Sequence, residues 1–542
     1  MSLGFFKVPE PVNEPVLNYA PGSAEKKSLK TELEKQSKTV VQIPLIIGGK
    51  EIITEKKNKI VSPHNHSHVI AECSLASEKE LKLAIQAALD AKKKWAKMPF
   101  EHKASIFLKA AYLMATQYRA TINAATMLGQ SKTAYQAEID AACELIDFLR
   151  FNVYFAQEIL KEQPISVDGI WNRMEYRPLD GFVAAISPFN FTAIAGNLVM
   201  SPAIMGNTLV WKPANTAVLS NYYIMKIYME AGLPDGVINF VPCAGSDMSK
   251  HVLSHTDMGG LHFTGSNDVF NTIWAAVGNN LKNYRAFPRL VGETGGKDFV
   301  FAHNSADIDG LVTALIRGAF EYQGQKCSAA SRAYIPKSIW GVVKEKLLAE
   351  VAKIKVGDVM DFRNFLGAVI DDKAFKSICK YIDDAKASPD VEVICGGHDG
   401  SKGYFVYPTI IHAKKIDYVT MKEEIFGPVL TIYVYEDEQF EETLEKCDNG
   451  SSYALTGAIF AKPRNIIKKM SKALTGAAGN FYINDKPTGA VVGQQPFGGS
   501  RGSGTNDKAG SPLNLQRWTS PRTIKETFRP ATEVKYPFMD EE

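Results

Sequence analysis

The segment Glu321-Tyr322-Gln323-Gly324-Gln325-Lys326-Cys327-Ser328-Ala329 places a thiol among glycine, amides and a cation instead of in an apolar run. A nucleophilic cysteine reacts as the thiolate, and a neighbouring ammonium or a helix N-terminus favours that charge. We therefore expect Cys327 to be accessible and Lys326 to favour its ionisation. The alternative is that Cys327 is a small buried hydrophobe, as most free cysteines are.

The other six cysteines lie in different surroundings. Two of them fall in apolar helical patterns and four lie near turns or strand ends: Cys143 and Cys379, then Cys73, Cys243, Cys395 and Cys447. None belongs to a CxxC pair, and an odd total of seven argues against a disulfide framework. The sequence therefore indicates a reducing compartment.

Composition is that of an ordinary soluble globular protein, with 45% hydrophobic residues, 22% charged residues and a formal net charge of +3 in 542 residues. This balance gives no electrostatic preference for nucleic acid or a membrane surface, and the length predicts two or more domains. The N-terminus shows neither an apolar signal core nor an Arg-rich amphipathic presequence, so we do not expect secretion.

The first 160 residues read as an arm followed by helices. Residues 1–40 combine a proline-punctuated stretch with a charged helical pattern over 23–38, and we expect them to be peripheral. His64-Asn65-His66-Ser67-His68 lies in a polar loop without a nearby cysteine or carboxylate, so we predict no metal ion there. Apolar residues then recur at helical spacing over 77–155.

Residues 162–180 break the helical pattern with Asp168-Gly169 and an alternating stretch over 170–177, which predicts a projecting β-hairpin. Residues 181–211 carry no charge, which raises the question of a membrane span. Interrupting prolines and asparagines favour buried strands over 181–186 and 209–211 instead, around a short helix.

Strands and helices alternate from residue 212 to 277 and again from about 299 to 484, which predicts doubly wound, mostly parallel sheets in two α/β lobes with a cleft between them. Neither a GxGxxG fingerprint nor a P-loop is present. Gly295-Gly296 permits close backbone approach and would let Glu293 face the cleft, although an isolated Glu beside glycines is also typical of a solvated turn.

Seven short motifs occur in the order in which they are found in aldehyde dehydrogenases, and the similarity covers roughly residues 45–530. The motifs are Ser187-Pro188-Phe189-Asn190, Trp211-Lys212-Pro213, Phe263-Thr264-Gly265-Ser266, Glu293-Thr294-Gly295-Gly296-Lys297, Gly324-Gln325-Lys326-Cys327, Glu424-Ile425-Phe426-Gly427-Pro428 and Pro496-Phe497-Gly498-Gly499. One motif alone is modest evidence, whereas seven in this order are hard to obtain by chance. The resemblance favours Cys327 as a nucleophile.

Within that family the chain resembles the stand-alone Δ1-pyrroline-5-carboxylate (glutamate-γ-semialdehyde) dehydrogenase subfamily, through Gln136-Ala137-Glu138-Ile139-Asp140, Phe189-Asn190-Phe191-Thr192, Lys326-Cys327-Ser328 and Asn484-Asp485-Lys486-Pro487-Thr488-Gly489-Ala490. The resemblance implies oxidation of L-glutamate γ-semialdehyde to glutamate in proline catabolism. It also implies a mitochondrial matrix enzyme if a presequence has been removed, and otherwise a cytoplasmic one.

The family resemblance implies an NAD-binding domain with N-terminal helices over 1–161 and 181–292, and a catalytic domain over 293–484. A small β oligomerisation element is expected from 162–180 and 485–542, in a homodimer or a higher homo-oligomer. An edge strand with free backbone groups is a pairing template, which fits that assignment.

The same resemblance implies the catalytic roles. Cys327 attacks the aldehyde, the Asn190 side chain and a backbone N–H stabilise the oxyanion, and Glu293 is the general base for hydrolysis of the thioester. The expected cofactor is NAD, with contacts from Lys212, Ser266, Glu424 and Phe426.

Six residues match the substrate contacts of the subfamily. We expect a carboxylate anchor at Ser328, Gly489 and Ala490, an ammonium contact at Glu138, and two rings flanking the aliphatic chain, Phe191 and Phe497. The alternative for residues 488–490 is a simple turn.

Two departures from the family pattern concern the cofactor, since Asn215 stands where many members have Glu, and Phe270 where many have Gly. Asn215 brings no charge to repel a 2′-phosphate, which leaves discrimination against NADP open. Two further hypotheses are a dehydrogenase of another aldehyde and a catalytically silent binding homologue.

Overall fold

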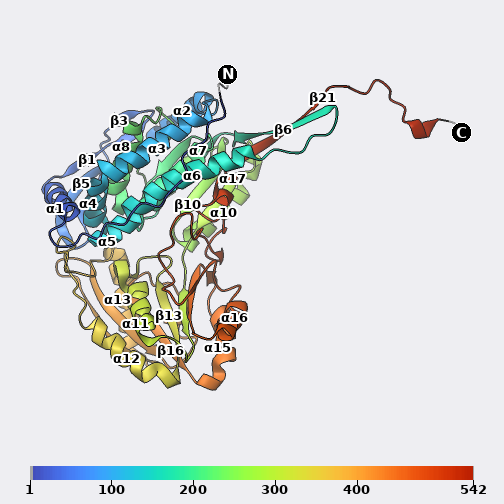
Figure 1. Ribbon diagram of the computed structural model, residues 1–542. Helices are drawn as coiled ribbons and strands as arrows, with labels where there is room; N and C mark the ends of the chain where they lie inside the picture. Colours follow the sequence, from blue (N-terminus) through green and yellow to red (C-terminus); the bar gives the residue numbers. More distant parts are fainter. Residues whose placement is uncertain (1–3, 541–542) are drawn as a thin grey trace.

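Two seven-stranded sheets organise the chain, one in each of two lobes (Figure 1). The computed structural model describes residues 4–540. The first sheet has the order β11-β10-β7-β8-β9-β2-β3. Its strands are β2 (Leu45–Ile47), β3 (Lys50–Ile52), β7 (Phe182–Ile186), β8 (Leu209–Lys212), β9 (Ile238–Phe240), β10 (Met258–Thr264) and β11 (Arg289–Glu293).

The second sheet has the order β14-β15-β16-β13-β12-β18-β19. Its strands are β12 (Asp298–Ala302), β13 (Ala330–Pro336), β14 (Val391–Asp399), β15 (Phe405–Ala413), β16 (Val429–Tyr435), β18 (Thr456–Phe460) and β19 (Asn480–Ile483). All its pairs are parallel except β14 with β15, and the first sheet is parallel from β11 to β9. The predicted pair of doubly wound α/β lobes is confirmed.

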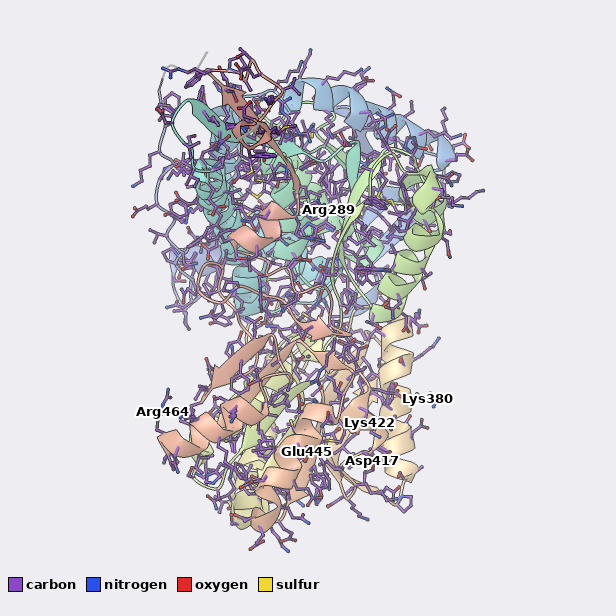
Figure 2. All side chains as sticks on the ribbon, turned by 90° about the vertical axis from the view of Figure 1, so that its right-hand side faces the viewer. Arg289, Lys380, Asp417, Lys422, Glu445 and Arg464 are labelled. Carbon is purple, nitrogen blue, oxygen red and sulfur yellow. The ribbon has the colours of Figure 1, made fainter. Side chains whose placement is uncertain are left out.

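Helices cover both sheets, as parallel strands require. In the first lobe they are α2 (Glu78–Trp95), α3 (Phe100–Thr116), α4 (Arg119–Gln130), α6 (Glu144–Lys161), α7 (Thr192–Ile204), α8 (Val218–Ala231) and α10 (Asn267–Asn279). In the second they are α11 (Ile308–Phe320), α12 (Lys337–Val351), α13 (Asp372–Ala387), α15 (Phe440–Asn449) and α16 (Arg464–Ala473). Charged side chains lie on their outer faces, as Figure 2 shows for Lys380, Glu445 and Arg464.

The uncharged run over 181–211 is part of the first core. Strand β7 is buried along Phe182–Ala185, and α7 buries nearly its whole surface. Because this region packs against protein on both faces, a charged side chain there would be buried, which explains why the run contains none. Among residues 4–540, no helix is both long and apolar enough to cross a membrane.

The predicted hairpin over 162–180 is wrong in its pairing. Strand β6 (Ile170–Pro178) pairs antiparallel with β21 (Thr519–Thr527), from Ile170 opposite Thr527 to Pro178 opposite Thr519. The alternating pattern was correct for a strand, but its partner lies more than 300 residues away and no local signal identifies it. The resulting two-stranded ribbon projects from the first lobe (Figure 1).

The N-terminus lies on the surface, as predicted, with most of residues 4–20 exposed, but a few of its side chains are buried against the first lobe. Helix α1 (Ala24–Ser37) occurs where expected, but its Leu29 and Leu33 are buried. The preceding stretch lacks helix and strand and still buries Val8 and Tyr19. We call residues 4–20 the N-terminal arm; it packs on α4 and α6.

Candidate active site

Cys327 lies between α11 and β13 in residues 321–329, which we call the Cys327 connection. The backbone takes an unusual path there. Tyr322, Gln323 and Gly324 have φ values of 51°, 54° and 65°, in the left-handed region. A Cβ on Gly324 would lie 2.2 Å from the carbonyl oxygen of Gly427, so only glycine fits. The Gln323 amide donates to the Ser131 and Ala368 carbonyls, which stabilises the turn. These contacts fix Cys327 at the junction of the two lobes.

The Cys327 thiol faces the Glu293 carboxylate. Sγ lies 3.8 Å from Oε1 of Glu293, which ends strand β11 in the other lobe. The expectation of an accessible thiol is wrong, since Cys327 is only 7% exposed. Burial, followed by the charge of Glu293, raises the pKa of the thiol well above its usual value. The thiol is therefore neutral at rest and needs a base to ionise it.

Glu293 has the properties of that base. It lies at the end of a paired strand and not in a solvated turn. Burial raises its pKa to about 7, while the hydrogen bond from Cys327 and the charge of Lys508 act in the opposite direction. A carboxyl with a pKa near neutrality can both accept and release a proton at physiological pH.

Lys326 does not point at Cys327, so its expected effect on the thiol is corrected. Its ammonium donates to Gln136 Oε1 at 2.5 Å and lies 3.4 Å from Asp140 Oδ2. Asp140 also pairs with Lys132 at 2.6 Å. The cation next to the nucleophile in sequence therefore belongs to a buried network that joins the Cys327 connection to residues 132–140.

Asn190 reaches the same connection from the loop after β7. It is buried, and its Nδ2 donates to the carbonyl of Gln325 at 3.1 Å. The Asn190 amide thus contacts Gln325, two positions before Cys327. Its second N–H can donate to an oxyanion formed on the substrate.

Two residues expected to contact the cofactor lie at the carboxyl edge of the first sheet. Chain order reverses between β7 and β10, and such switch points are where open α/β sheets bind ligands. Ser266 caps α10 directly after β10, and Lys212 ends β8. Asn215 adds a buried Oδ1 without a hydrogen-bond partner in the described part of the chain, an acceptor free for a ribose hydroxyl.

Glu424 and Phe426 come to this edge from the second lobe. Glu424 accepts a hydrogen bond of 2.9 Å from the Gly296 N–H, and a Cβ on Gly295 would lie 2.1 Å from Glu424 Oε2. The glycine pair thus leaves room for the Glu424 carboxylate, whereas the sequence predicted only that it lets Glu293 face the cleft. Phe426, at φ 57°, packs its ring edge-to-face against Phe189 at 5.8 Å.

The predicted carboxylate anchor lies beside the nucleophile. The hydroxyls of Ser328 and Thr488 are hydrogen-bonded at 2.8 Å. Gly489 follows at φ 96°, which a side chain would strain, and Ala490 comes next. We call residues 488–497 the anchor loop.

The two predicted aromatic contacts are also near the site. Phe497, at the end of the anchor loop, lines a pocket together with Glu293. Lys132 Nζ lies over the Phe191 ring, 4.2 Å from the centroid of that ring. Lys132 lies equally close to the ring of Tyr322, which links Phe191 to the Cys327 connection.

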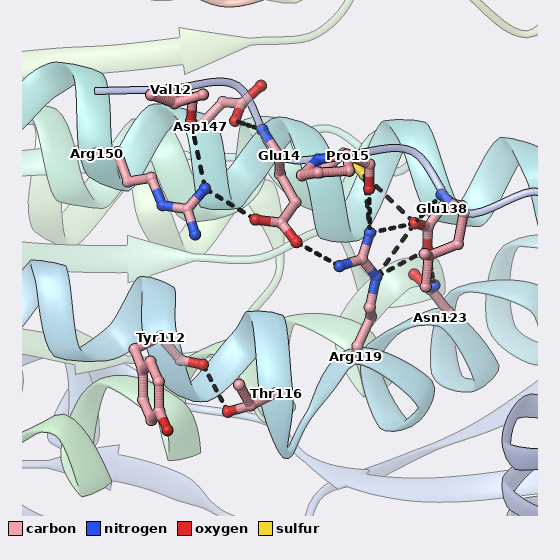
Figure 3. A network of polar contacts seen from close by, with 12 residues as sticks. Val12, Glu14, Pro15, Tyr112, Thr116, Arg119, Asn123, Glu138, Asp147 and Arg150 are labelled. Carbon is pink, nitrogen blue, oxygen red and sulfur yellow. Dashed lines mark hydrogen bonds and ion pairs between the residues drawn. The ribbon is translucent and has the colours of Figure 1, made fainter. Parts of the chain in front are cut away.

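Glu138 is not brought to this site, and its assignment to the substrate is wrong. It has no exposed surface, and its oxygens accept hydrogen bonds from Tyr19, Asn123, Arg119 and the Leu17 N–H under the N-terminal arm (Figure 3). A saturated, buried carboxylate has no capacity for a ligand.

A different acidic residue, Glu144, was missed by the sequence analysis. It begins α6 and lines the same pocket as Glu293 and Phe497. Burial, followed by the charge of Asp140, raises its pKa well above the usual value. The available signal was an acid within the apolar run over 141–146, and Phe148, one turn further along α6, lines the same pocket.

Comparisons with known proteins agree with this geometry. The aldehyde dehydrogenase family model matches residues 52–524. The Δ1-pyrroline-5-carboxylate dehydrogenases named mitochondrial from Dictyostelium discoideum and Homo sapiens are 56% and 50% identical to the chain. The matches cover 98% and 97% of this chain and 96% and 94% of those proteins.

A solved structure provides the third comparison. The Δ-pyrroline-5-carboxylate dehydrogenase of Mycobacterium tuberculosis bound with NAD has a TM-score of 0.97 and 52% identity, over 100% of both chains. The family model and these relatives span nearly the whole sequence, including the thiol, its carboxylate partner and both sheets. The chain belongs to the aldehyde dehydrogenase family.

Proposed function

We propose that the protein oxidises L-glutamate γ-semialdehyde, in equilibrium with Δ1-pyrroline-5-carboxylate, to L-glutamate with NAD as the hydride acceptor, in proline catabolism. The observation that carries the proposal is the Cys327–Glu293 pair at 3.8 Å with the Ser328–Thr488 pair directly beside it. The first pair supports aldehyde oxidation, and the second supports selection of a carboxylated substrate. The names of the relatives specify the same reaction.

The covalent step begins with proton transfer from Cys327 Sγ to Glu293 and formation of the bond between sulfur and the aldehyde carbon. The Asn190 amide and a backbone N–H of the Cys327 connection donate to the resulting oxyanion. When bound, NAD accepts the hydride from that carbon, which leaves a thioester on Cys327. Glu293 releases the thiol proton to solvent and is a carboxylate again. It then takes a proton from water while the water oxygen attacks the thioester. The carbon–sulfur bond breaks, the acid leaves, and the Cys327 thiolate takes the proton back from Glu293.

Substrate selection requires groups for both charges at the far end of the semialdehyde. We assign the α-carboxylate to the Ser328 hydroxyl and to the backbone N–H groups of Gly489 and Ala490. The α-ammonium is assigned to Glu144 in place of Glu138, because Glu144 lines the pocket and Glu138 does not. A bound ammonium would also stabilise the ionised form of the Glu144 carboxyl. Phe191 and Phe497 flank the aliphatic middle.

The chain's groups fit NAD at the carboxyl edge of the first sheet. The N-terminus of α10 with Ser266 suits the pyrophosphate, Lys212 and the unpartnered Asn215 oxygen suit the adenosine ribose, and Glu424 suits the nicotinamide ribose. Phe426 packs beside that carboxylate. These residues bind and orient the cofactor and do not exchange protons with the substrate.

The domain assignments given by the family resemblance are retained as part of the proposal, with the β6–β21 ribbon and the C-terminal segment as the oligomerisation element. The ribbon exposes Trp171 and is followed by an exposed Phe528, which is consistent with a homodimer or a larger homo-oligomer. We propose a mitochondrial matrix location, which is supported by relatives that are named mitochondrial. Fractionation of the native source tests the location.

The test of the reaction is an absorbance measurement of reduced cofactor with a panel of aldehydes. We expect NAD reduction with L-glutamate γ-semialdehyde, and a kcat/KM at least about tenfold above that for propanal, the value of one charged hydrogen bond. Equal kcat/KM values for the two substrates would refute the selective site, and no reduction with any aldehyde would indicate a silent homologue.

A further inference from the structure

The side chain of Asn13 joins three parts of the molecule that are far apart in sequence. Its Nδ2 donates to Asp147 Oδ2 at 2.8 Å and to the Val492 carbonyl at 2.9 Å. Its Oδ1 accepts from Gln494 Nε2 at 2.9 Å. The amide nitrogen therefore bonds to both α6 and the anchor loop, and the amide oxygen bonds to the anchor loop.

Each of these partners lies next to a group assigned to the substrate. Asp147 comes one helical turn after Glu144 on α6. Val492 and Gln494 lie between Ala490 and Phe497 in the anchor loop. Asn13 thus contacts α6, which carries Glu144, and the anchor loop, which ends at Phe497. Glu144 and Phe497 line the pocket, and Asn13 does not.

The N-terminal arm is held firmly where Asn13 makes these contacts. The N–H of Glu14 donates to Asp147 Oδ1 at 2.7 Å, and its carboxylate pairs with Arg150 at 2.8 Å and with Arg119 (Figure 3). These ion pairs are partly buried, so solvent screens them less than surface pairs. They fix the position of the Asn13 backbone relative to α6.

The anchor loop itself approaches α6 closely at the same level. Gly493 has φ 81°, and a Cβ on it would lie 2.2 Å from the Phe151 ring. Close packing sets a minimum distance between loop and helix, whereas the Asn13 amide, bonded to both, sets the maximum. The distance between the anchor loop and α6 therefore has both a lower and an upper limit.

We propose that Asn13 is a positioning residue, which holds the anchor loop at a fixed distance from α6 and thereby sets the affinity for the carboxylate and ammonium end of the substrate. The inference rests on the proposed function, because it requires the anchor loop to bind the carboxylate. Cys327 and Glu293 lie outside these contacts, so the chemical step does not depend on Asn13.

The experiment compares Asn13→Ala with Gln157→Ala. Gln157 is a matched control, because it holds Phe6 and Val8 of the same arm on the same helix with two hydrogen bonds but does not bond to the anchor loop. For Asn13→Ala we expect the KM for L-glutamate γ-semialdehyde to rise about tenfold, the size of one lost contact to a charged group, with kcat nearly unchanged. The kcat/KM for propanal should stay within about threefold, since propanal has no charged end to anchor. Gln157→Ala should alter neither substrate.

An equal loss on both aldehydes, a loss in kcat alone, or the same effect from Gln157→Ala would overturn the inference. If Asn13→Ala does not fold, Gln494→Ala is the second variant, because it removes only the exposed partner of Asn13 in the anchor loop. It should raise the KM for the semialdehyde and leave the kcat/KM for propanal nearly unchanged. An unchanged KM for the semialdehyde in Gln494→Ala would also overturn the inference. Failure of the proposed function is distinguishable, because the unmodified protein would then show no preference for the semialdehyde.

Discussion

Cys327 Sγ lies 3.8 Å from Glu293 Oε1, with the thiol on the second lobe and the carboxyl at the last residue of β11 in the first. The pairing depends on the left-handed turn at Tyr322–Gly324 and on the glycines that admit Glu424 beside β11. Because both groups are shielded from water, burial raises the pKa of each, to about 7 for Glu293 and well above its usual value for Cys327. This relationship leads to the first two predictions.

Glu293→Gln should lower steady-state turnover by about a hundredfold or more, the usual contribution of a general base. A glutamine can still accept a hydrogen bond from the thiol but cannot take a proton. If hydrolysis of the thioester depends on this base more than attack does, stopped-flow absorbance should show a burst of reduced cofactor followed by slow turnover. Unchanged steady-state turnover would remove Glu293 from the mechanism.

The pH dependence should follow the Glu293 pKa of about 7. Because the carboxylate form is the active base, kcat should rise with pH through about 7 and then level off. Glu424 also has a pKa raised to about 7 by burial, so the comparison of Glu293→Gln with Glu424→Gln identifies the group. The acidic limb should persist in the Glu424 variant; its disappearance there alone would assign the limb to Glu424 instead.

Ser328→Ala should reduce kcat/KM for L-glutamate γ-semialdehyde about ten- to a hundredfold, as expected for a lost hydrogen bond to a charged group. Propanal should be affected much less. Ser331→Ala is a matched control on β13, because the Ser331 hydroxyl has no hydrogen-bond partner among residues 4–540. A similar loss on both aldehydes would contradict the carboxylate anchor.

The β6–β21 ribbon should mediate self-association. Light scattering at micromolar concentration should give the mass of a dimer or a larger assembly. Trp171→Asp on the ribbon should shift the population toward monomer, whereas Leu83→Asp, an exposed apolar residue on α2, should not. A monomeric wild-type protein would rule out the oligomerisation element.

Local patterns in the sequence predicted the fold well where neighbours in sequence are also neighbours in space. The uncharged run became β7, α7 and β8, and the alternation after Lys212 became β9, β10 and α10. The pairing of β6 with β21 and the packing of the N-terminal arm were not predictable in this way. Both depend on contacts between segments that only the completed fold brings together.

The candidate site shows the same division. Motif order identified Cys327, Glu293, Asn190 and Glu424, which the structure brings to one junction between the lobes. The surroundings of individual side chains were less predictable. Lys326 is next to Cys327 in sequence, and Glu138 lies in a motif that the subfamily shares, yet both belong to buried ion networks. Glu144, six residues after Glu138 (144 − 138), lines the pocket of Glu293 and Phe497.

The central claim is oxidation through a covalent bond to Cys327, and NAD reduction by Cys327→Ala with L-glutamate γ-semialdehyde tests it most directly. Alanine removes the sulfur that forms the thioester in this mechanism and leaves the cofactor residues in place. We predict that reduction of NAD falls to background in this variant while NAD binding, measured by calorimetry, and the melting temperature remain close to those of the wild type. Turnover near the wild-type rate would contradict the covalent mechanism.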